Sequence, residues 1–377
     1  MERLSPQSID RWNAVERAGI ELLTVSADTS RILDKLFTRY CEVYRDVEAR
    51  AEVQVKRVAA HPKMTSFQFV DADTVREANS LPNCFRMRGK YGDRAVKLVV
   101  KTARPDVDTF VPLLRQALSI LWLYGRQVKS SNITIYDTAL TKHLPRTAGE
   151  AIGARHVNSG ATFTYSTQPS QVVIWRREEM TKVLAHEVVH SLQLDAPRIS
   201  KKLEHKFFDI FRISANRPLL PNEAYVESVA NILNCFYISL ATGASLQRSL
   251  DVERRFAVYS TARVLAHYGF DDPSQLLRSV PTATPDIQQD TSVFSYYVLR
   301  AALLFNVDAF IAFGGQAETF PCFPSRTGAA AEFVNLAASA ASSTSFIAAV
   351  RVAMRSQSKI GGGVTTTLRM TALELHM

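Results

Sequence analysis

The feature that most constrains this sequence is the stretch "TKVLAHEVVHSLQLD", residues 181–195, which contains His-Glu-Val-Val-His. An α-helix turns by about 100° per residue, so His186 and His190, four positions apart, project side by side from such a helix. Two imidazoles placed in this way can occupy two corners of a tetrahedral zinc site. The apolar side chains that form a second stripe, nearly opposite the histidines, are Leu184, Val188 and Leu192. One face of the helix can therefore pack on a core while the other lines a cleft.

Glu187 follows the first histidine directly. A carboxylate at this position can accept a proton from a water activated by a metal and then deliver it to a leaving group. The alternative is that three polar residues share a helix by chance. The probability that a His-Glu-x-x-His motif occurs by chance in a chain of this length is on the order of one in a hundred. The motif lies on a predicted helix that follows a predicted strand. This context favours a metal site with Glu187 as its general base.

A third metal ligand is expected downstream of the two histidines. The metzincin pattern HExxHxxGxxH is absent, because Gln193 and Ala196 stand where that pattern has glycine and the third histidine. The segment "PNEAYVESVANIL" instead places Glu223 and Glu227 four positions apart on a second predicted helix. The alternative for these two residues is an exposed acidic pair, and His205 is a weaker candidate ligand.

Together the two segments resemble the zinc-binding helices of the gluzincins, the thermolysin-like metallopeptidases, whose second helix carries Asn-Glu-x-x-x-Asp. The resemblance implies that Glu223 is the third zinc ligand. It also places Glu227 where the family has an aspartate that orients a ligand histidine, although glutamate is longer by one methylene. A role for Glu227 as the ligand itself remains the alternative.

The pattern of apolar residues predicts an α+β fold that is mostly helical. The resemblance covers residues 160–232 and adds a zincin-like core, with a small mixed sheet, the HExxH helix and a helical C-terminal part. In zincins an extended substrate pairs with a strand that borders the cleft, and "SGATFTYS" is the expected edge strand here, with an ordinary hairpin strand as the equal alternative. Gluzincins also use a Tyr or His beyond the zinc helices to stabilise the oxyanion. Tyr297 is the first choice for this role and His267 the second, although both residue types are more often part of a core.

The chain is expected to contain four consecutive regions. They are an N-terminal helical and mixed region (1–104), a zincin-like metal-site domain (105–243), a helical C-terminal domain (244–354) and a flexible tail (355–377). Within them, residues 28–58 are predicted to form one long helix, and "TSFQFV", residues 65–70, a strand. Residues 108–125, "DTFVPLLRQALSILWLYG", are apolar almost all round, which predicts a buried helix that ends at Gly125.

The net charge of +9 and the isoelectric point of about 9.4 could favour acidic partners. The densest basic groups are short, namely Arg86-Met-Arg88-Gly-Lys90 and Arg198-Ile-Ser-Lys201-Lys202. A solvated basic surface is therefore favoured over a dedicated nucleic-acid face, and the expected partner is a polypeptide substrate or another protein. The four cysteines form no CxxC pair, and neither a secretory signal nor a membrane span is visible, so the cytoplasm is the expected compartment.

These observations predict a zinc-dependent metallohydrolase, and within that class a peptidase, with Zn²⁺ as its cofactor. The alternative is a structural or assembly protein on a zincin scaffold, with a structural or vestigial metal site. The longer string "NSGATF…VVIWRREEMTKVLAHEVVHSLQLD" also resembles uncharacterised HExxH proteins encoded by viruses, and a virion component would fit that alternative. The presence of Glu187 beside both histidines favours the enzyme, because an enzyme that has lost its activity usually loses its base first.

Overall fold

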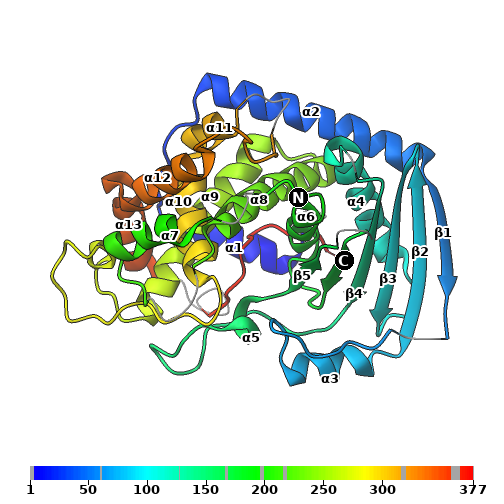
Figure 1. The fold of residues 1–377 in the computed structure, drawn as a ribbon, viewed down its shortest axis with the longest axis horizontal. Helices are drawn as coiled ribbons and strands as arrows, with labels where there is room; N and C mark the ends of the chain where they lie inside the picture. The colour runs from blue at the N-terminus through cyan, green and yellow to red at the C-terminus, as the bar shows by residue number, and fades with distance from the viewer. Residues whose placement is uncertain are drawn as a thin grey trace. The chain divides into compact units, whose positions relative to one another are not determined.

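The computed structural model describes residues 4–59, 62–126, 128–165, 169–195, 199–214, 219–315, 320–357 and 366–376. The described residues form an α+β fold, mostly helical, as predicted (Figure 1). They divide into two compact units. The sheet unit takes its residues from 35–141 and 158–194, and the helical unit takes its residues from 1–34, 142–157 and 195–376. The domain boundaries predicted after residues 104, 243 and 354, and the zincin-like core, stay predictions.

The sheet unit is built on one six-stranded mixed sheet with the order β1-β2-β3-β4-β6-β5. The strands are β1 (Glu52–Arg57), β2 (Asn83–Tyr91), β3 (Arg94–Thr102), β4 (Ser130–Tyr136), β5 (Gly160–Phe163) and β6 (Gln171–Ile174). Strands β3, β4 and β6 run parallel to one another, and the remaining neighbours are antiparallel. Strand β5, from "SGATFTYS", pairs antiparallel with β6 and is an edge strand of the sheet.

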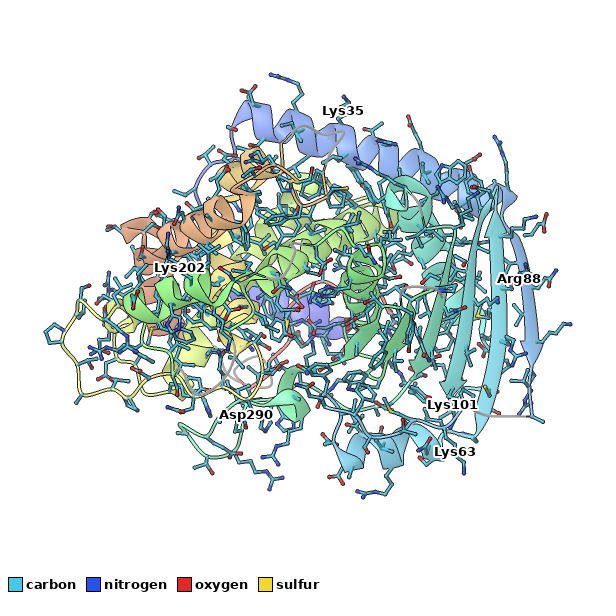
Figure 2. All side chains as sticks on the ribbon, in the orientation of Figure 1. Lys35, Lys63, Arg88, Lys101, Lys202 and Asp290 are labelled. Carbon is cyan, nitrogen blue, oxygen red and sulfur yellow. The ribbon has the colours of Figure 1, made fainter. Side chains whose placement is uncertain are left out.

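Alternation of apolar and polar residues gives the sheet two unlike faces. On one face Met87, Leu98 and Ile133 stand in register on three neighbouring strands and are buried. Helix α4 (Val111–Tyr124) packs on this face so closely that a Cβ atom at Gly89 would lie 3.1 Å from Cγ of Leu114. We call this the helix-covered face. The opposite face, the open face, carries Arg88, which Figure 2 shows on the outer strands of the sheet.

The other helices of the sheet unit correct two sequence predictions. Helix α2 (Ala27–Arg50) ends at Arg50, so the helix predicted over 28–58 is wrong beyond that residue. Residues 52–57 alternate as a strand should, and they form β1 because β2 offers a partner along their whole length. No strand forms over 65–70, which makes a turn with one isolated bridge between Phe67 and Val70. The ring of Phe67 packs there against Trp175 in a small apolar cluster, beside α3 (Ala72–Ser80).

The helical unit consists of helices and the segments that join them. Its α-helices are α1 (Pro6–Arg17), α5 (Ala154–Val157), α7 (Lys201–Ile210), α8 (Pro221–Thr242), α9 (Leu246–His267), α10 (Arg300–Phe305), α11 (Val307–Gly314), α12 (Ala329–Ser342) and α13 (Thr344–Ser356). Short 3₁₀ helices cover Asp108–Phe110 in the sheet unit and Pro273–Leu276 here, and a π-helical stretch covers Phe294–Leu299. Helix α9 is the centre of the unit and packs against α1, α8, α10 and α13.

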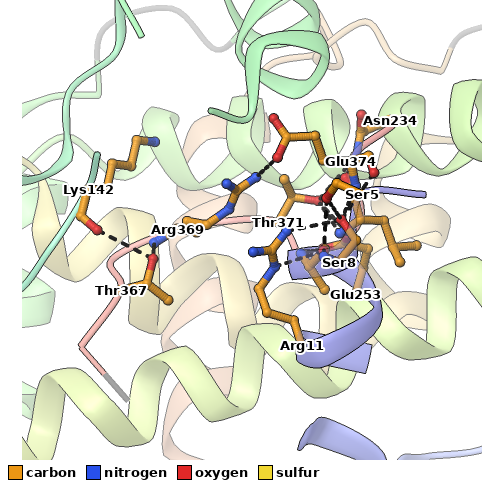
Figure 3. A network of polar contacts seen from close by, with 12 residues as sticks. Ser5, Ser8, Arg11, Lys142, Asn234, Glu253, Thr367, Arg369, Thr371 and Glu374 are labelled. Carbon is orange, nitrogen blue, oxygen red and sulfur yellow. Dashed lines mark hydrogen bonds and ion pairs between the residues drawn. The ribbon is translucent and has the colours of Figure 1, made fainter. Parts of the chain in front are cut away.

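Residues 366–376, here named the C-terminal segment, are packed inside the helical unit. Leu368 and Leu373 are fully buried, and the backbone N–H of Ser5 donates to the carbonyl of Glu374 at 2.9 Å. Figure 3 shows the polar contacts of the segment, in which the buried carboxylate of Glu253 faces Thr371. Residues 358–365 and 377 of the predicted flexible tail lie outside the described residues.

Among the described residues, none of the helices taken singly combines the length and the apolar character needed to cross a bilayer. Two bent helix pairs meet that test jointly, by length and composition alone; they are Phe294–Phe305 with Val307–Gly314, and Ala329–Ser342 with Thr344–Ser356.

Candidate metal centre

The His-Glu-Val-Val-His motif lies on helix α6 (Met180–Ser191), as the sequence predicts. Leu184 and Val188 are almost fully buried on this helix, which packs against α4, β5 and β6. An ion pair holds the residues before the helix to the end of β4. The guanidinium of Arg177 donates from Nε to Oδ1 of Asp137 at 2.7 Å and from Nη2 to Oδ2 at 3.0 Å. This bidentate contact, to a carboxylate that is 1% exposed, ties the segment that precedes α6 to the sheet.

His186 and His190 lie as the four-residue spacing predicts. Their Nε2 atoms are 3.2 Å apart, with His186 buried and His190 partly exposed. Two ligand nitrogens that are each about 2.0 Å from a tetrahedral zinc ion would be about 3.3 Å apart. The same separation also suits an N–H···N hydrogen bond between neutral imidazoles. The pair therefore has the geometry of two zinc ligands without requiring a metal to explain it.

Glu223, the third ligand predicted from the sequence, lies on the first turn of α8. One ligand atom from each of His186, His190 and Glu223 lies within 4.8 Å of the other two, so this group could hold a metal ion. Two imidazoles and one carboxylate are the donor set of many catalytic zinc sites, in which a fourth position stays open. Nitrogen and carboxylate donors also accept other divalent metals, so the donor set alone does not identify the ion.

Glu187 points from α6 to the edge strand β5. Its carboxylate is buried, and Oγ1 of Thr162 donates to Oε2 at 2.7 Å, with the backbone carbonyl of Glu187 3.0 Å from the same hydroxyl. The side chain of Glu187 also packs against the backbone of Gly160, where an added Cβ atom would overlap Oε1 and come within 2.8 Å of Cγ and Cδ. The carboxylate thus accepts a hydrogen bond from Thr162 and packs against the backbone of Gly160.

Thr162 and Gly160 were not identified as functional residues from the sequence. Both lie in "SGATFTYS", which was predicted to be the edge strand, but nothing local to that stretch indicates which of its residues contacts Glu187. Only the packing of α6 against β5 brings these residues together.

The remaining predicted site residues lie in the helical unit. Glu227 is buried on α8, one turn beyond Glu223. Tyr297 is fully buried and its hydroxyl donates to the carbonyl of Leu368, while Nε2 of His267, the last residue of α9, donates to the carbonyl of Glu150 at 2.8 Å. The roles of Glu227, Tyr297 and His267 stay predictions. The weaker candidate ligand His205 is exposed on α7, with its ring against that of Phe208.

Comparison with known proteins gives a limited result. No family model matches the chain, and no solved structure matches it. An uncharacterized protein of Acanthamoeba polyphaga mimivirus is 28% identical over 166 residues, which cover 41% of this chain and 41% of that protein. This chain thus spans well under half the length of its viral relative. The predicted similarity to uncharacterised viral proteins is confirmed in this coarse form, and membership of the gluzincins is not shown.

Proposed function

We propose that this protein is a zinc-dependent hydrolase of the gluzincin type that cleaves peptide bonds. The observation that carries the proposal is the convergence of ligand atoms from His186, His190 and Glu223, with the buried Glu187 on the same helix as the two histidines. The 3.2 Å separation of the two Nε2 atoms and the donor set both fit zinc. Zinc, when bound by these three residues, would supply a Lewis acid that activates a water and polarises a carbonyl group.

In the proposed reaction, Glu187 carries out the proton transfers. Its carboxylate accepts a proton from the attacking water and then delivers it to the nitrogen of the leaving amine, so that the peptide bond is replaced by a carboxylic acid and an amine. Thr162 holds one carboxylate oxygen of this group by donating to Oε2. Among the described residues β5 is the last strand of the sheet, so its outer edge offers backbone N–H and C=O groups with which an extended peptide could pair near Glu187.

Metal content and hydrolysis test the ligand set together. We expect purified protein to contain about one zinc ion per chain and to cleave fluorescently labelled casein, with both properties lost on treatment with 1,10-phenanthroline and restored by added zinc. His190→Ala and Glu223→Ala each remove one of the three ligands and should lose the metal and the activity together. His205→Ala is the matched control on an exposed histidine of α7 and should keep both. Protein that binds no zinc even when zinc is supplied would refute the metal site.

Thr162 is expected to contribute through the position of Glu187. Thr162→Val keeps the shape of the side chain and removes the hydroxyl, so the carboxylate loses one hydrogen bond, and we expect kcat for a peptide substrate to fall by about 10-fold at unchanged KM. Zinc content should be unchanged, because Thr162 is not a ligand. Thr162→Ser restores the hydroxyl and should restore kcat to near the parent value. An equal loss in the Val and Ser variants would show that packing on β5, and not the hydroxyl, is what matters.

A further inference from the structure

The open face of the sheet carries a concentrated set of cations. Side chains alternate between the two faces of a strand, so Arg86, Arg88 and Lys90 of β2 all point to the same side. The register of the sheet adds one cation from each neighbouring strand, because Lys56 of β1 stands opposite Arg86, and Lys97 of β3 stands opposite Arg88. All five of these side chains are exposed. The basic residues of β2 form only a short group in the sequence. Because they are two residues apart, however, all of their charges lie on one surface of the sheet.

The five cations occupy a small area. Residues two apart on a strand are about 6.8 Å apart and neighbouring strands are about 4.8 Å apart, so the set covers about 14 Å by 10 Å. Glu52, opposite Lys90, is the single acidic residue on this face of β1, β2 and β3. Within the described part of the chain, none of the five cations forms an ion pair. Their charge is therefore available to an anionic partner.

At the other end of the strands, near α3, the same face of the sheet is covered by other residues. Lys101, at the end of β3, is buried and donates from Nζ to the carbonyl of Asn79 on α3 at 3.3 Å. Figure 2 shows Lys101 toward the end of the sheet at which α3 lies, apart from Arg88. Ala78 of α3 packs with Tyr136 and Val173 in the apolar cluster that covers this end of the sheet. The exposed cations thus form a bounded patch and do not extend over the whole face.

We propose that the open face of the sheet binds the phosphate backbone of double-stranded nucleic acid, without regard to base sequence. Five exposed cations within about 14 Å, with one carboxylate beside them, match a polymer that carries a dense and regular row of negative charge. No aromatic side chain lies on this face in β1, β2 or β3, so the patch offers no platform for stacking unpaired bases, and the contacts it can make are to phosphates. Such binding is separate from the proposed hydrolysis.

The test measures the affinity of purified full-length chain for a fluorescein-labelled 20-base-pair DNA duplex by fluorescence anisotropy. We expect the logarithm of the binding constant to fall with the logarithm of salt concentration with a slope of about −4, as for four to five neutralised phosphates. The triple variant Arg86→Gln, Arg88→Gln, Lys97→Gln should bind about 100-fold more weakly at 0.1 M salt and have a slope smaller in magnitude by about 3. A second duplex of unrelated sequence should give the same affinity.

A matched variant controls for net charge. Arg146→Gln, Lys201→Gln, Lys202→Gln also removes three exposed cations, from the helical unit, and should keep the affinity and the slope of the parent. Equal weakening by the two triple variants would mean that only net charge matters, and it would overturn the proposal. So would a chain that binds vesicles of phosphatidylcholine and phosphatidylserine but not the duplex, because the partner would then be an anionic membrane. Casein cleavage in the sheet variant should be unchanged, so this result can fail independently of the proposed hydrolase activity.

Discussion

Replacement of Glu187 by glutamine is expected to reduce hydrolysis of casein by about 1000-fold while zinc content stays at about one ion per chain. Glutamine has almost the same shape as glutamate and can still accept the hydrogen bond from Thr162, so the local packing should persist. It cannot take up a proton from water, and the proposed reaction depends on that transfer. Metal analysis by mass spectrometry and the rate of casein cleavage, measured on the same preparation, check the two parts of this expectation.

The outcome separates the two functions considered for this chain. Glu42→Gln, an equivalent change on an exposed residue of α2, is the control and should keep both zinc and activity. Zinc in the parent and in Glu187→Gln, with casein cleavage in neither, would contradict the hydrolase and support a scaffold protein that retains a structural metal. Loss of zinc in Glu187→Gln would show that this carboxylate is itself needed to hold the ion.

Glu253→Gln is expected to lower the free energy of unfolding by about 3 kcal/mol and the midpoint of thermal unfolding by about 6 °C. Both carboxylate oxygens of Glu253 accept hydrogen bonds, from the hydroxyl of Thr371 and the backbone N–H of Leu373 to Oε1, and from the backbone N–H of Ala372 and the amide of Asn231 to Oε2. The amide nitrogen of glutamine would have to face one of these pairs of donors.

The charge of Glu253 does not explain this expected loss. Burial raises the pKa of Glu253, and the hydrogen bonds from Thr371, Leu373 and Ala372 oppose that rise without cancelling it. Ionisation is therefore less favourable here than in water, and removal of the charge alone would not destabilise the fold. The cost in Glu253→Gln comes from the donors left without an acceptor.

Two measurements make the expectation about Glu253 specific. Chemical denaturation gives the loss of stability, and Glu42→Gln should lie within about 0.5 kcal/mol of the parent. Hydrogen exchange should show the amide protons of Ala372 and Leu373 exchanging faster in Glu253→Gln, because these protons are bound by the altered side chain. A stability equal to that of the control, with unchanged exchange at both amides, would show that Glu253 does not hold the C-terminal segment.

The parts of the structure that could be predicted from the sequence are those that local periodicity determines. The i, i+4 spacing of His186 and His190 specifies their shared direction once a helix forms, and the same spacing indicated α8 as the source of Glu223. The buried helix predicted over 108–125 forms as α4 after a short 3₁₀ turn and ends at Gly125. In each case the pattern of residues close together in the sequence is enough to predict the structure.

The parts that could not be predicted depend on a partner distant in the sequence. The alternation in 52–57 rests on only two valines, which is too short a signal to end the helix predicted before it, and the stretch becomes a strand because β2 pairs with it along its whole length. Thr162 contacts Glu187 across 25 positions, and the C-terminal segment reaches Glu253 across more than a hundred. The basic open face is a third case, since single-strand alternation aligns Arg86 with Arg88, but only the register with β1 and β3 adds Lys56 and Lys97.

Gly160 has a consequence for how related sequences should be judged. Any other amino acid there would place its first side-chain carbon against Glu187, so the proposed base would have to shift even though every residue of the His-Glu-Val-Val-His motif remained. A homologue with alanine or a larger residue at this position could therefore still bind the ion and yet be a poor catalyst. Glycine at this position of the edge strand is thus a second sequence marker, remote from the motif. It would help to distinguish homologues that catalyse hydrolysis from homologues that only bind the metal.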